Sequence, residues 1–345
     1  MDDAEPTAAP PRGRDEEAPW RGPVRGGHPD PALAARAGIE FLDALLAGET
    51  PAPPLARLTG MAPVTLRSDC ARYTMPLSPW LCDDDGRIPL GVMAIPADAA
   101  MACAIIAGLP AQTTITTSEL GLRQVRPARP GGVLVTTASV VDLTPTHPTV
   151  ALAEVTVTDD AGTLIARGGS LCVILRFDGD GDGGNADGTQ DADGAADADA
   201  DEPATTAAGP DPWERRSPGA GLSRLTGLET RAVAANEAVV ALPATRWLCA
   251  PPPGRVQGGA VAMLAGAAID AAMQTAAPAG HRFTPVELKL NYLRPLASDG
   301  REATGHATLV HGGRRTAVAR AEVSDADGRA IAVASGSAIA EPLAR

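Results

Sequence analysis

Aromatic residues and cysteine are both scarce in this 345-residue chain. Aromatics make up 3% of the sequence, so Ala and Val must do much of the packing within an apolar content of 44%. The five cysteines show no C-x-x-C spacing, which favours reduced thiols over a disulfide framework or a zinc site. We therefore expect no metal and no cofactor.

Concentrated basic charge and long apolar runs are also missing. The formal charge is −13, but ten acids lie between Asp178 and Glu202 without any Lys or Arg, which leaves the rest of the chain near −3. A nucleic-acid partner requires a concentrated basic face, so this class is excluded. The acidic, Pro-rich start has no apolar signal core, and no apolar run approaches the ~20 residues of a membrane span. We expect a soluble, cytoplasmic protein.

What the chain does contain is one stretch written twice. "WLCDDDGRIPLGVMAIPADAA" begins at Trp80, and "WLCAPPPGRVQGGAVAMLAGAA" begins at Trp247. Trp80 and Trp247 are 167 residues apart, and so are the starts of "LARLTGM" at Leu55 and "LSRLTGL" at Leu222. The offset becomes 168 from the Gly86–Gly254 match onward, and it stays within one or two residues along about 120 residues. This period is too long for a solenoid, so the pattern indicates one fold that has been duplicated.

The composition between and before the copies sets the domain boundaries. Residues 1–30 are rich in Pro, Gly, Arg and acids, and predict a disordered leader. Apolar residues at helical spacing predict a helix over 31–48, at the start of a first domain covering 31–177. Residues 178–213 are Gly, Asp and Ala with almost no large apolar residue, and predict a flexible linker. The second domain covers 214–345.

Each copy is predicted to contain a strand, a long apolar helix and then several strands. In the second copy residues 258–275 form the helix, and the alternating segments that follow are broken by turns at 311–313 and 325–328. A central apolar helix against an antiparallel sheet is an α+β architecture.

The order of motifs resembles one family. "GETPAPP", "GRVQGG", "LKLNYLRP" and "GRRTAVARAEVSDADGR" follow one another as in hotdog-fold acyl-CoA thioesterases of the phenylacetate-pathway (PaaI-like) type, over roughly 35–177 and 222–341. The resemblance implies a tandem double hotdog, two antiparallel sheets each wrapped around a long helix. It also implies active sites at the interface, each taking a Gly-Gly helix start from one hotdog and an acid from the other.

The two copies retain different parts of that site. Counted from the family's His position, the second copy has Gln257 and then Gly266, so the glycines are kept and the acid is lost. The same count in the first copy runs from Pro89 to Asp98, so the acid is kept. The resemblance therefore implies one complete composite site per chain, made of Asp98 with Gln257 and Gly258.

The predicted chemistry is thioester hydrolysis with an acyl-CoA substrate. Asp98 would act as a general base on water or attack directly to form an anhydride, and its carboxyl pKa should be raised by burial. The N–H of Gly258 is the expected oxyanion donor, because a helix start leaves backbone N–H groups free. Gln257 could add an amide donor, and Gly259 is an expected substrate contact. Thr117 lies where the family often has a water-holding hydroxyl.

Each assignment has a structural alternative that stays open at this stage. Asp98 could be an ordinary acid near a helix start, Gly258 and Gly259 could form only a tight helix entry, and Thr117 and Gln257 could be structural. Pro96, two residues before Asp98, should kink the helix and could displace the acid.

Arg314 and Arg315 are candidate contacts for the coenzyme A phosphates, with solvated strand-end charges as the alternative. They follow the literal "HGG" at His311, which the pattern assigns to a hairpin turn.

The rival functions are a double hotdog that binds a thioester or a partner without turnover, and a hydratase, for which the Asp–His pair is missing. The hotdog pair is intramolecular, and further pairing into a homo-oligomer is left open.

Overall fold

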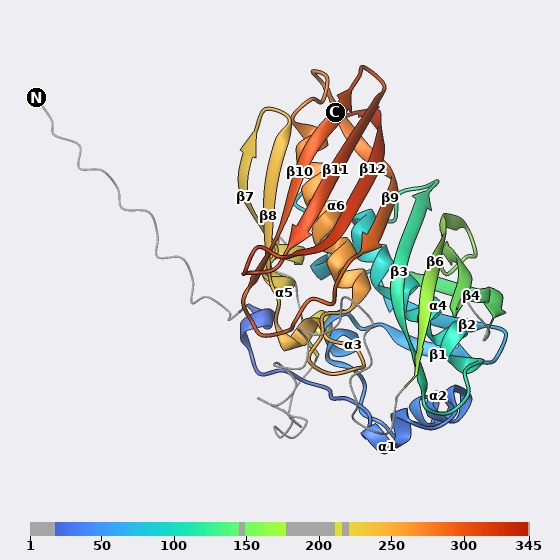
Figure 1. The fold of residues 1–345 in the computed structure, drawn as a ribbon. Helices are drawn as coiled ribbons and strands as arrows, with labels where there is room; N and C mark the ends of the chain where they lie inside the picture. The colour runs from blue at the N-terminus through green and yellow to red at the C-terminus, as the bar shows by residue number, and fades with distance from the viewer. Residues whose placement is uncertain (1–17, 145–148, 177–210, 216–220, 344–345) are drawn as a thin grey trace, which may run out of the picture.

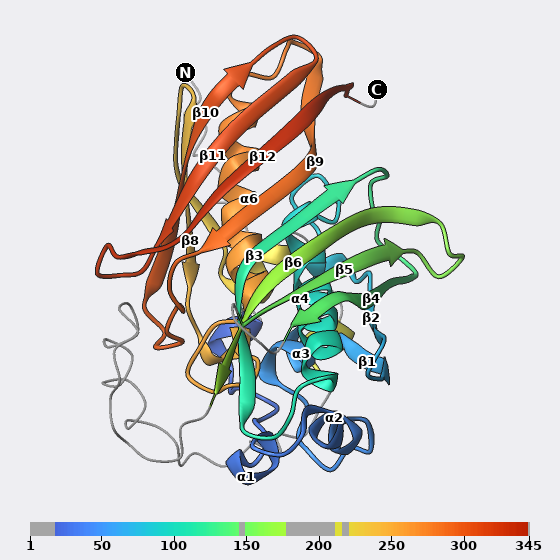
Figure 2. The ribbon, with the colours of Figure 1, turned by 45° about the vertical axis from the view of Figure 1, so that its right-hand side comes forward.

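The computed structural model describes residues 18–144, 149–176, 211–215 and 221–343. They form one twelve-stranded antiparallel sheet, in which each half of the chain contributes six neighbouring strands. Two long helices lie against this sheet, one in each half (Figures 1 and 2). The α+β class and the double-hotdog architecture predicted from the sequence are confirmed.

The strands of the first half run across the sheet in the order β1-β2-β4-β5-β6-β3. In chain order they are β1 Ala62–Leu66, β2 Ala71–Pro76, β3 Thr113–Gln124, β4 Val133–Thr144, β5 Val150–Thr158 and β6 Leu164–Arg176. The second half continues as β9-β12-β11-β10-β8-β7. Its strands are β7 Glu229–Ala234, β8 Glu237–Pro243, β9 His281–Tyr292, β10 Glu302–Gly312, β11 Thr316–Ser324 and β12 Ala330–Pro342.

The halves join through β3 and β9, whose register is symmetric. Gly121 pairs with Lys289, which lies 168 residues later in the sequence. On either side of this pair Leu120 pairs with Leu290 and Leu122 with Leu288, and an offset of 168 residues exchanges these two pairs. The duplicated fold therefore forms a pair about an approximate two-fold axis, and the sheet runs without interruption from one copy into the other. Among the described strands, β1 and β7 are the edges of this sheet, and the strands at the junction between the halves are paired on both sides.

The central helices α4 (Leu90–Ala107) and α6 (Gly258–Gln274) cross at two glycines. A Cβ built on Gly259 would lie 2.5 Å from Ile95 Cα, and one on Gly91 would lie 2.9 Å from Met263 Cα. Such distances are far below van der Waals contact, so only glycine allows the helices to approach this closely. This crossing brings the start of α6 against the middle of α4.

Helix α4 continues through Pro96 without a break. By length and composition alone it could cross a membrane, contrary to our expectation that no apolar run would approach that length. In the structure most of the helix is buried, between the first half of the sheet and α6. Its apolar composition is therefore explained by its position as the core helix of the first hotdog.

The predicted helix over 31–48 consists of two helices, α1 (Pro31–Ala34) and α2 (Gly38–Leu46). The chain turns between them because Gly38 abuts the end of α4, where a Cβ would lie 1.7 Å from the Ile106 carbonyl oxygen. The predicted α6 and the turn after His311 agree with the structure.

The two WLC segments are held by chain segments that precede the opposite hotdog. Trp80 donates its indole N–H to the Arg215 carbonyl at 2.6 Å, and Trp247 donates to the Gly22 carbonyl at 3.1 Å. These acceptors adjoin two short 3-10 helices, η3 (Pro212–Glu214) and η1 (Pro19–Arg21).

We call residues 18–22 and 211–215 the exchanged arms. Trp20 of the first arm packs on Gly227 of the second hotdog, and Trp213 of the second arm packs on Gly60 of the first hotdog. The predicted leader is therefore too long at its C-terminal end, since residues 18–30 are described and part of them docks on the second hotdog. Residues 1–17 and most of the predicted linker lie outside the described residues.

Two further pairs of short elements complete the symmetric frame. Helix α3 (Pro54–Thr59) begins with a hydrogen bond from Leu55 N–H to the Cys249 carbonyl at 3.2 Å. Helix α5 (Gly221–Thr226) begins with one from Leu222 N–H to the Cys82 carbonyl at 3.0 Å. They anchor the 3-10 turns η2 (Pro79–Leu81) and η4 (Arg246–Leu248) of the opposite copies.

Candidate active site

The carboxyl group of Asp98 lies at the helix crossing and faces the start of α6. Asp98 is buried, with 6% of its surface exposed. Its Oδ2 accepts a hydrogen bond from Gly259 N–H at 3.2 Å, and its Oδ1 accepts one from the Thr117 hydroxyl at 3.4 Å. The acid therefore belongs to the first hotdog, while one of its two hydrogen-bond donors belongs to the second.

The environment of Asp98 raises the pKa of its carboxyl group to about 6. Burial is the largest cause, because it disfavours the charged form. The bonds from Gly259 and Thr117 act in the opposite direction by stabilising the carboxylate. A carboxyl group with this pKa is ionised at neutral pH, and it is a stronger base than an exposed aspartate.

The backbone N–H groups of the first two residues of α6 differ in whether they are already hydrogen-bonded. The Gly259 N–H is used by Asp98, whereas no hydrogen bond between described residues uses the Gly258 N–H. The Gly258 carbonyl accepts a bond from the Tyr292 hydroxyl at 2.8 Å. A Cβ on Gly258 would lie 3.1 Å from Asp98 Oδ2, so glycine also keeps space beside the acid.

Tyr292 lies at the end of β9 and was not among the residues singled out from the sequence. Burial, followed by the nearby charges of Asp98 and Cys172, raises the pKa of its phenol well above the usual value. The hydroxyl therefore stays protonated and serves as a donor that fixes the Gly258 peptide. The motif "LKLNYLRP" contains this residue, but nothing in the pattern indicated that its side chain would reach the helix start.

Gln257 precedes α6 and links the two hotdogs. Its Nε2 donates to the Ile95 carbonyl of α4 at 3.0 Å, and its buried Oε1 has no partner among the described residues. The amide donor that we expected at the oxyanion is thus engaged with the opposite helix. Because Gln257 has no acid or base function, this bond supports a positioning role.

Thr117 is itself held by a buried thiol. The Sγ of Cys172 lies 3.9 Å from Thr117 Oγ1 as a donor, and Ser170 Oγ lies 3.4 Å from the same sulfur. Burial, as the largest cause, raises the pKa of the Cys172 thiol to about 11. The thiol therefore stays protonated at neutral pH, and it can leave the Thr117 proton free to bond to Asp98.

A cavity of about 830 Å³ opens beside these groups. Asp98, Thr117, Gln257 and Gly258 contribute to its wall, together with residues from both hotdogs and from α2. The expected site residues are thus brought together, and Gly259 contacts the acid directly. A space of this size lies within the range of small-molecule binding sites.

Arg314 and Arg315 are not part of this group. They are exposed in the turn between β10 and β11, where Gly312 lies against Ala276, just beyond the end of α6. The helix has 17 residues, so its two ends are about 25 Å apart. The arginines that do line the cavity include Arg255, from the "GRVQGG" motif, and Arg294, from "YLRP".

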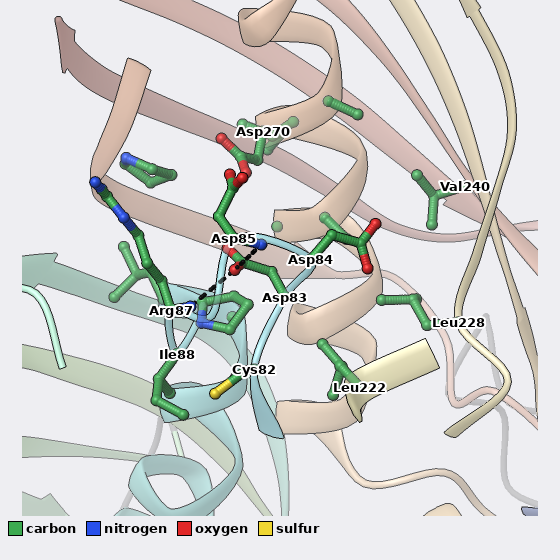
Figure 3. Close-up of a pocket in the computed structure, with 18 of the residues that line it drawn as sticks. Cys82, Asp83, Asp84, Asp85, Arg87, Ile88, Leu222, Leu228, Val240 and Asp270 are labelled. Atoms are coloured by element: carbon green, nitrogen blue, oxygen red, sulfur yellow. Dashed lines mark hydrogen bonds between the residues drawn. The ribbon is translucent and has the colours of Figure 1, made fainter. Parts of the chain in front are cut away.

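The two-fold axis relates this cavity to a second, smaller one of about 250 Å³ (Figure 3). Pro89 and Gly266 line it at the positions that correspond to Gln257 and Asp98. Carboxylates of Asp84, Asp85 and Asp270 lie around the space between α6 and the 82–88 loop. This cavity therefore lacks the acid at the helix crossing.

The charges of the smaller cavity are partly paired across the two hotdogs. Arg282 forms an ion pair with Asp85, and Arg87 forms one with Glu341 at 3.3 Å. Asp270 accepts a hydrogen bond from Gln274 at 2.7 Å, and its carboxyl pKa is raised to about 6, mainly by burial. At the position that corresponds to Asp98 this cavity has Gly266, which lies against Gly91 at the start of α4 and carries no acid.

These features define a double hotdog in which, of the two cavities described, one has an acid at the helix crossing; we call it the acid-bearing cavity. Residues 254–332 match the model of the thioesterase superfamily, over less than half of the chain. A search of curated proteins finds no match.

Solved structures with the same fold cover most of the chain. A tesB protein of Mycobacterium avium subspecies paratuberculosis is 12% identical, with a TM-score of 0.54 over 84% of this chain and 98% of the other. The acyl-CoA thioesterase II TesB2 of Mycobacterium marinum is also 12% identical, with a TM-score of 0.52 over 84% and 99%. A hot dog fold protein of Alicyclobacillus acidocaldarius is 13% identical, with a TM-score of 0.50 over 85% and 100%. At such identities the likeness establishes the fold.

Proposed function

We propose that this protein hydrolyses acyl-CoA thioesters at the composite site between its two hotdogs. The observation that carries the proposal is the buried Asp98 carboxyl group of one hotdog, bound by the Gly259 N–H at the helix start of the other. The thioesterase-superfamily match over 254–332 and the names of the double-hotdog structures support the reaction class. The motif order supports the phenylacetate-pathway type.

In this mechanism the acyl carbonyl oxygen points at the Gly258 N–H. Asp98 takes a proton from a water molecule as the water attacks the carbonyl carbon, and the developing oxyanion is stabilised by that N–H and by the positive end of the α6 dipole. The tetrahedral intermediate then collapses and expels the thiolate of coenzyme A. Asp98 returns its proton to the thiolate, so acyl-CoA and water yield the free acid and coenzyme A.

Three neighbours hold these groups in place. Thr117 donates to Asp98 and fixes the direction of the carboxylate, Gln257 ties α6 to α4, and Tyr292 fixes the Gly258 peptide. General-base catalysis of this kind contributes about 10²–10⁴ in rate. One oxyanion donor contributes on the order of 3 kcal/mol. At the open side of the cavity, Arg255 and Arg294 are the guanidinium groups we assign to the phosphates of coenzyme A.

The test is a free-thiol assay against a panel of acyl-CoAs from acetyl to palmitoyl, with phenylacetyl-CoA included. The wild-type protein should release coenzyme A from at least one member, and Asp98→Asn should abolish most of that release while still binding the substrate. Binding without turnover in the wild type would contradict hydrolysis and support the alternative, a non-catalytic thioester-binding protein. In ¹⁸O-labelled water, label that enters the Asp98 carboxyl group during a single turnover identifies an anhydride hydrolysed at the Asp98 carbonyl carbon, because general-base attack on the thioester puts the label only in the released acid.

A further inference from the structure

The acid-bearing cavity has a branch that runs from Asp98 along α4 into the first hotdog. Lining residues on α4 recur at Asp98, Ala102 and Ile106, with Ala99 and Cys103 beside them. Residues four apart stack on one face of a helix, so these side chains form a continuous wall. Beyond Asp98 itself, this wall carries no charge.

Helix α2 forms the opposite wall of the branch. Phe41 and Leu45, four residues apart on one face, line the cavity, while Leu42 on another face is fully buried in the core. Met61, the residue before β1, and Tyr73 of β2 also line the cavity. The Tyr73 hydroxyl lies 3.2 Å from the Cys103 thiol, so these two polar groups satisfy each other.

The far end of the branch is closed by the start of α2. Gly38 abuts the Ile106 carbonyl, and its N–H bonds to the Leu109 carbonyl at 3.0 Å. Phe41 follows three residues later on the same helix. The branch therefore ends at Ile106, eight residues or about 12 Å along the helix from Asp98.

We infer that this branch is an acyl-chain site for a straight acyl group of about ten carbon atoms, with Phe41 and Ile106 closing its end. An extended polypeptide advances about 3.5 Å for every three backbone bonds, or about 1.2 Å per bond, and an extended alkyl chain is similar. About ten bonds thus span the 12 Å between the reacting carbonyl and Ile106. This inference rests on the proposed function for its reaction, but its geometry can be tested by binding alone.

The smaller cavity, where we propose no acyl chain, has charged residues at the positions that line the branch. At the position corresponding to Ala102 it has Asp270, and at the position of Thr114 it has Arg282. An alkyl chain could not be buried against these charges without a large desolvation cost. The apolar wall beside Asp98 is therefore a property of the acid-bearing copy and not of the fold in general.

Binding should be measured by calorimetry with alkyl-CoA thioethers of four to sixteen carbons, which resist hydrolysis. Affinity should rise about fourfold for each added methylene up to about ten carbons and then level off or fall. The acyl-CoA kcat/KM values should follow the same profile. An affinity that does not depend on chain length, or that rises steadily to sixteen carbons, would overturn the inference.

Two variants locate the site. Ala102→Phe fills the branch half-way, so the ratio of decyl to butyl affinity should fall at least a hundredfold with butyl binding unchanged. Ile106→Ala opens the end, and should move the optimum to longer chains without the risk of overpacking. Leu46→Phe is the matched control, because Leu46 is on α2 but exposed and outside the cavity lining.

The outcomes separate this inference from the proposed function. Length-dependent thioether binding that responds to Ala102→Phe, without turnover of any acyl-CoA, retains the acyl site and rejects the hydrolase. Turnover lost in Asp98→Asn, with a chain-length profile unchanged in Ala102→Phe and Ile106→Ala, retains the hydrolase and rejects the acyl site.

Discussion

The two cavities of this protein occupy equivalent places in a duplicated fold, yet they differ in almost every feature that matters for chemistry. One has a volume of about 830 Å³, an acid at the helix crossing and an apolar branch. The other has a volume of about 250 Å³, Gly266 in place of the acid, and charged side chains in place of the branch. We propose that duplication supplied two equal sites and that subsequent change left the chemistry in one of them.

The frame around the cavities has stayed symmetric. The glycine crossing, the β3–β9 register and the exchanged arms each obey the two-fold relation. These features determine whether the two halves dock at all, so a change in either copy would disturb both cavities. Side chains that line only one cavity are free of that constraint, because a change in them leaves the docking of the two halves intact.

The exchanged arms provide the largest expected effect. Trp213→Ala and Trp20→Ala each remove a partly buried ring that packs on a glycine of the opposite hotdog. We expect each to lower the free energy of unfolding by about 2–4 kcal/mol. Urea unfolding measures both, with Val64→Ala, which alters an exposed side chain, as the control. A cost confined to one arm would show that the frame is not symmetric.

Asp98 and Asp270, one in each cavity, both have a raised carboxyl pKa and therefore both make the stability of the protein depend on pH. The folded pKa of Asp98 is raised to about 6 from 3.8, so the folded state binds the proton more tightly than the unfolded state does. Stability is therefore full below pH 3.8 and falls as the pH rises through 6.

Asp98→Asn removes this loss. It should stabilise the protein by up to about 3 kcal/mol above pH 7 and have little effect at pH 4. Asp270→Asn should act in the same direction, since burial raises that pKa as well. Unfolding curves at pH 4 and pH 8 measure both variants, and destabilisation by Asp98→Asn at pH 8 would contradict the assigned pKa.

Thr117 offers a smaller, kinetic distinction, since its counterpart in the second copy is Pro285. Thr117→Val keeps the shape but removes the hydrogen bond that stabilises the Asp98 carboxylate. We expect kcat to fall about tenfold, as for loss of one hydrogen bond to a charged group. The acidic limb of the pH profile should also move to higher pH. Thr156→Val, on β5, is the control, and an unmoved limb would show that Thr117 does not act through Asp98.

The smallest expected effect concerns the phosphates of the substrate. Arg255→Gln should raise KM for acyl-CoA about two- to fivefold, and the effect should weaken with salt, as for an exposed ion pair. The double variant Arg314→Gln/Arg315→Gln should leave KM unchanged, because the turn that holds these residues lies beyond the far end of α6. A raised KM in the double variant would show that the turn between β10 and β11 contributes to substrate binding.

Much of the architecture could be predicted because the same sequence motifs occur in both copies of the duplicated fold. The resemblance to hotdog thioesterases, applied to both copies, implied that Asp98, Gln257 and Gly258 form one site, and all three line the same cavity in the structure. Gly259 was expected at the substrate and instead donates to the acid. Pro96 suggested displacement of Asp98, but α4 continues through it because packing on α6 and the sheet holds the helix on all sides.

Other features depend on contacts that local sequence does not encode. Tyr292 bonds to Gly258 within the second half, 34 residues away in the sequence, and the exchanged arms bond across the interface between the halves. The break between α1 and α2 arises from a collision with α4, which helical periodicity within 31–48 could not reveal. Arg314 and Arg315 were candidate phosphate contacts with solvated strand-end charges as the alternative, and the structure places their turn beyond the far end of α6.

The most direct test of the central claim is the pH dependence of kcat/KM in wild type, Asp98→Asn and Asp270→Asn. Both acids have a pKa raised to about 6, one in each cavity, so the titration alone does not favour either. The account predicts an acidic limb near pH 6 in the wild type and in Asp270→Asn, and a rate lower by about 10²–10⁴ without that limb in Asp98→Asn. A limb that survives in Asp98→Asn, or that disappears in Asp270→Asn, would contradict it.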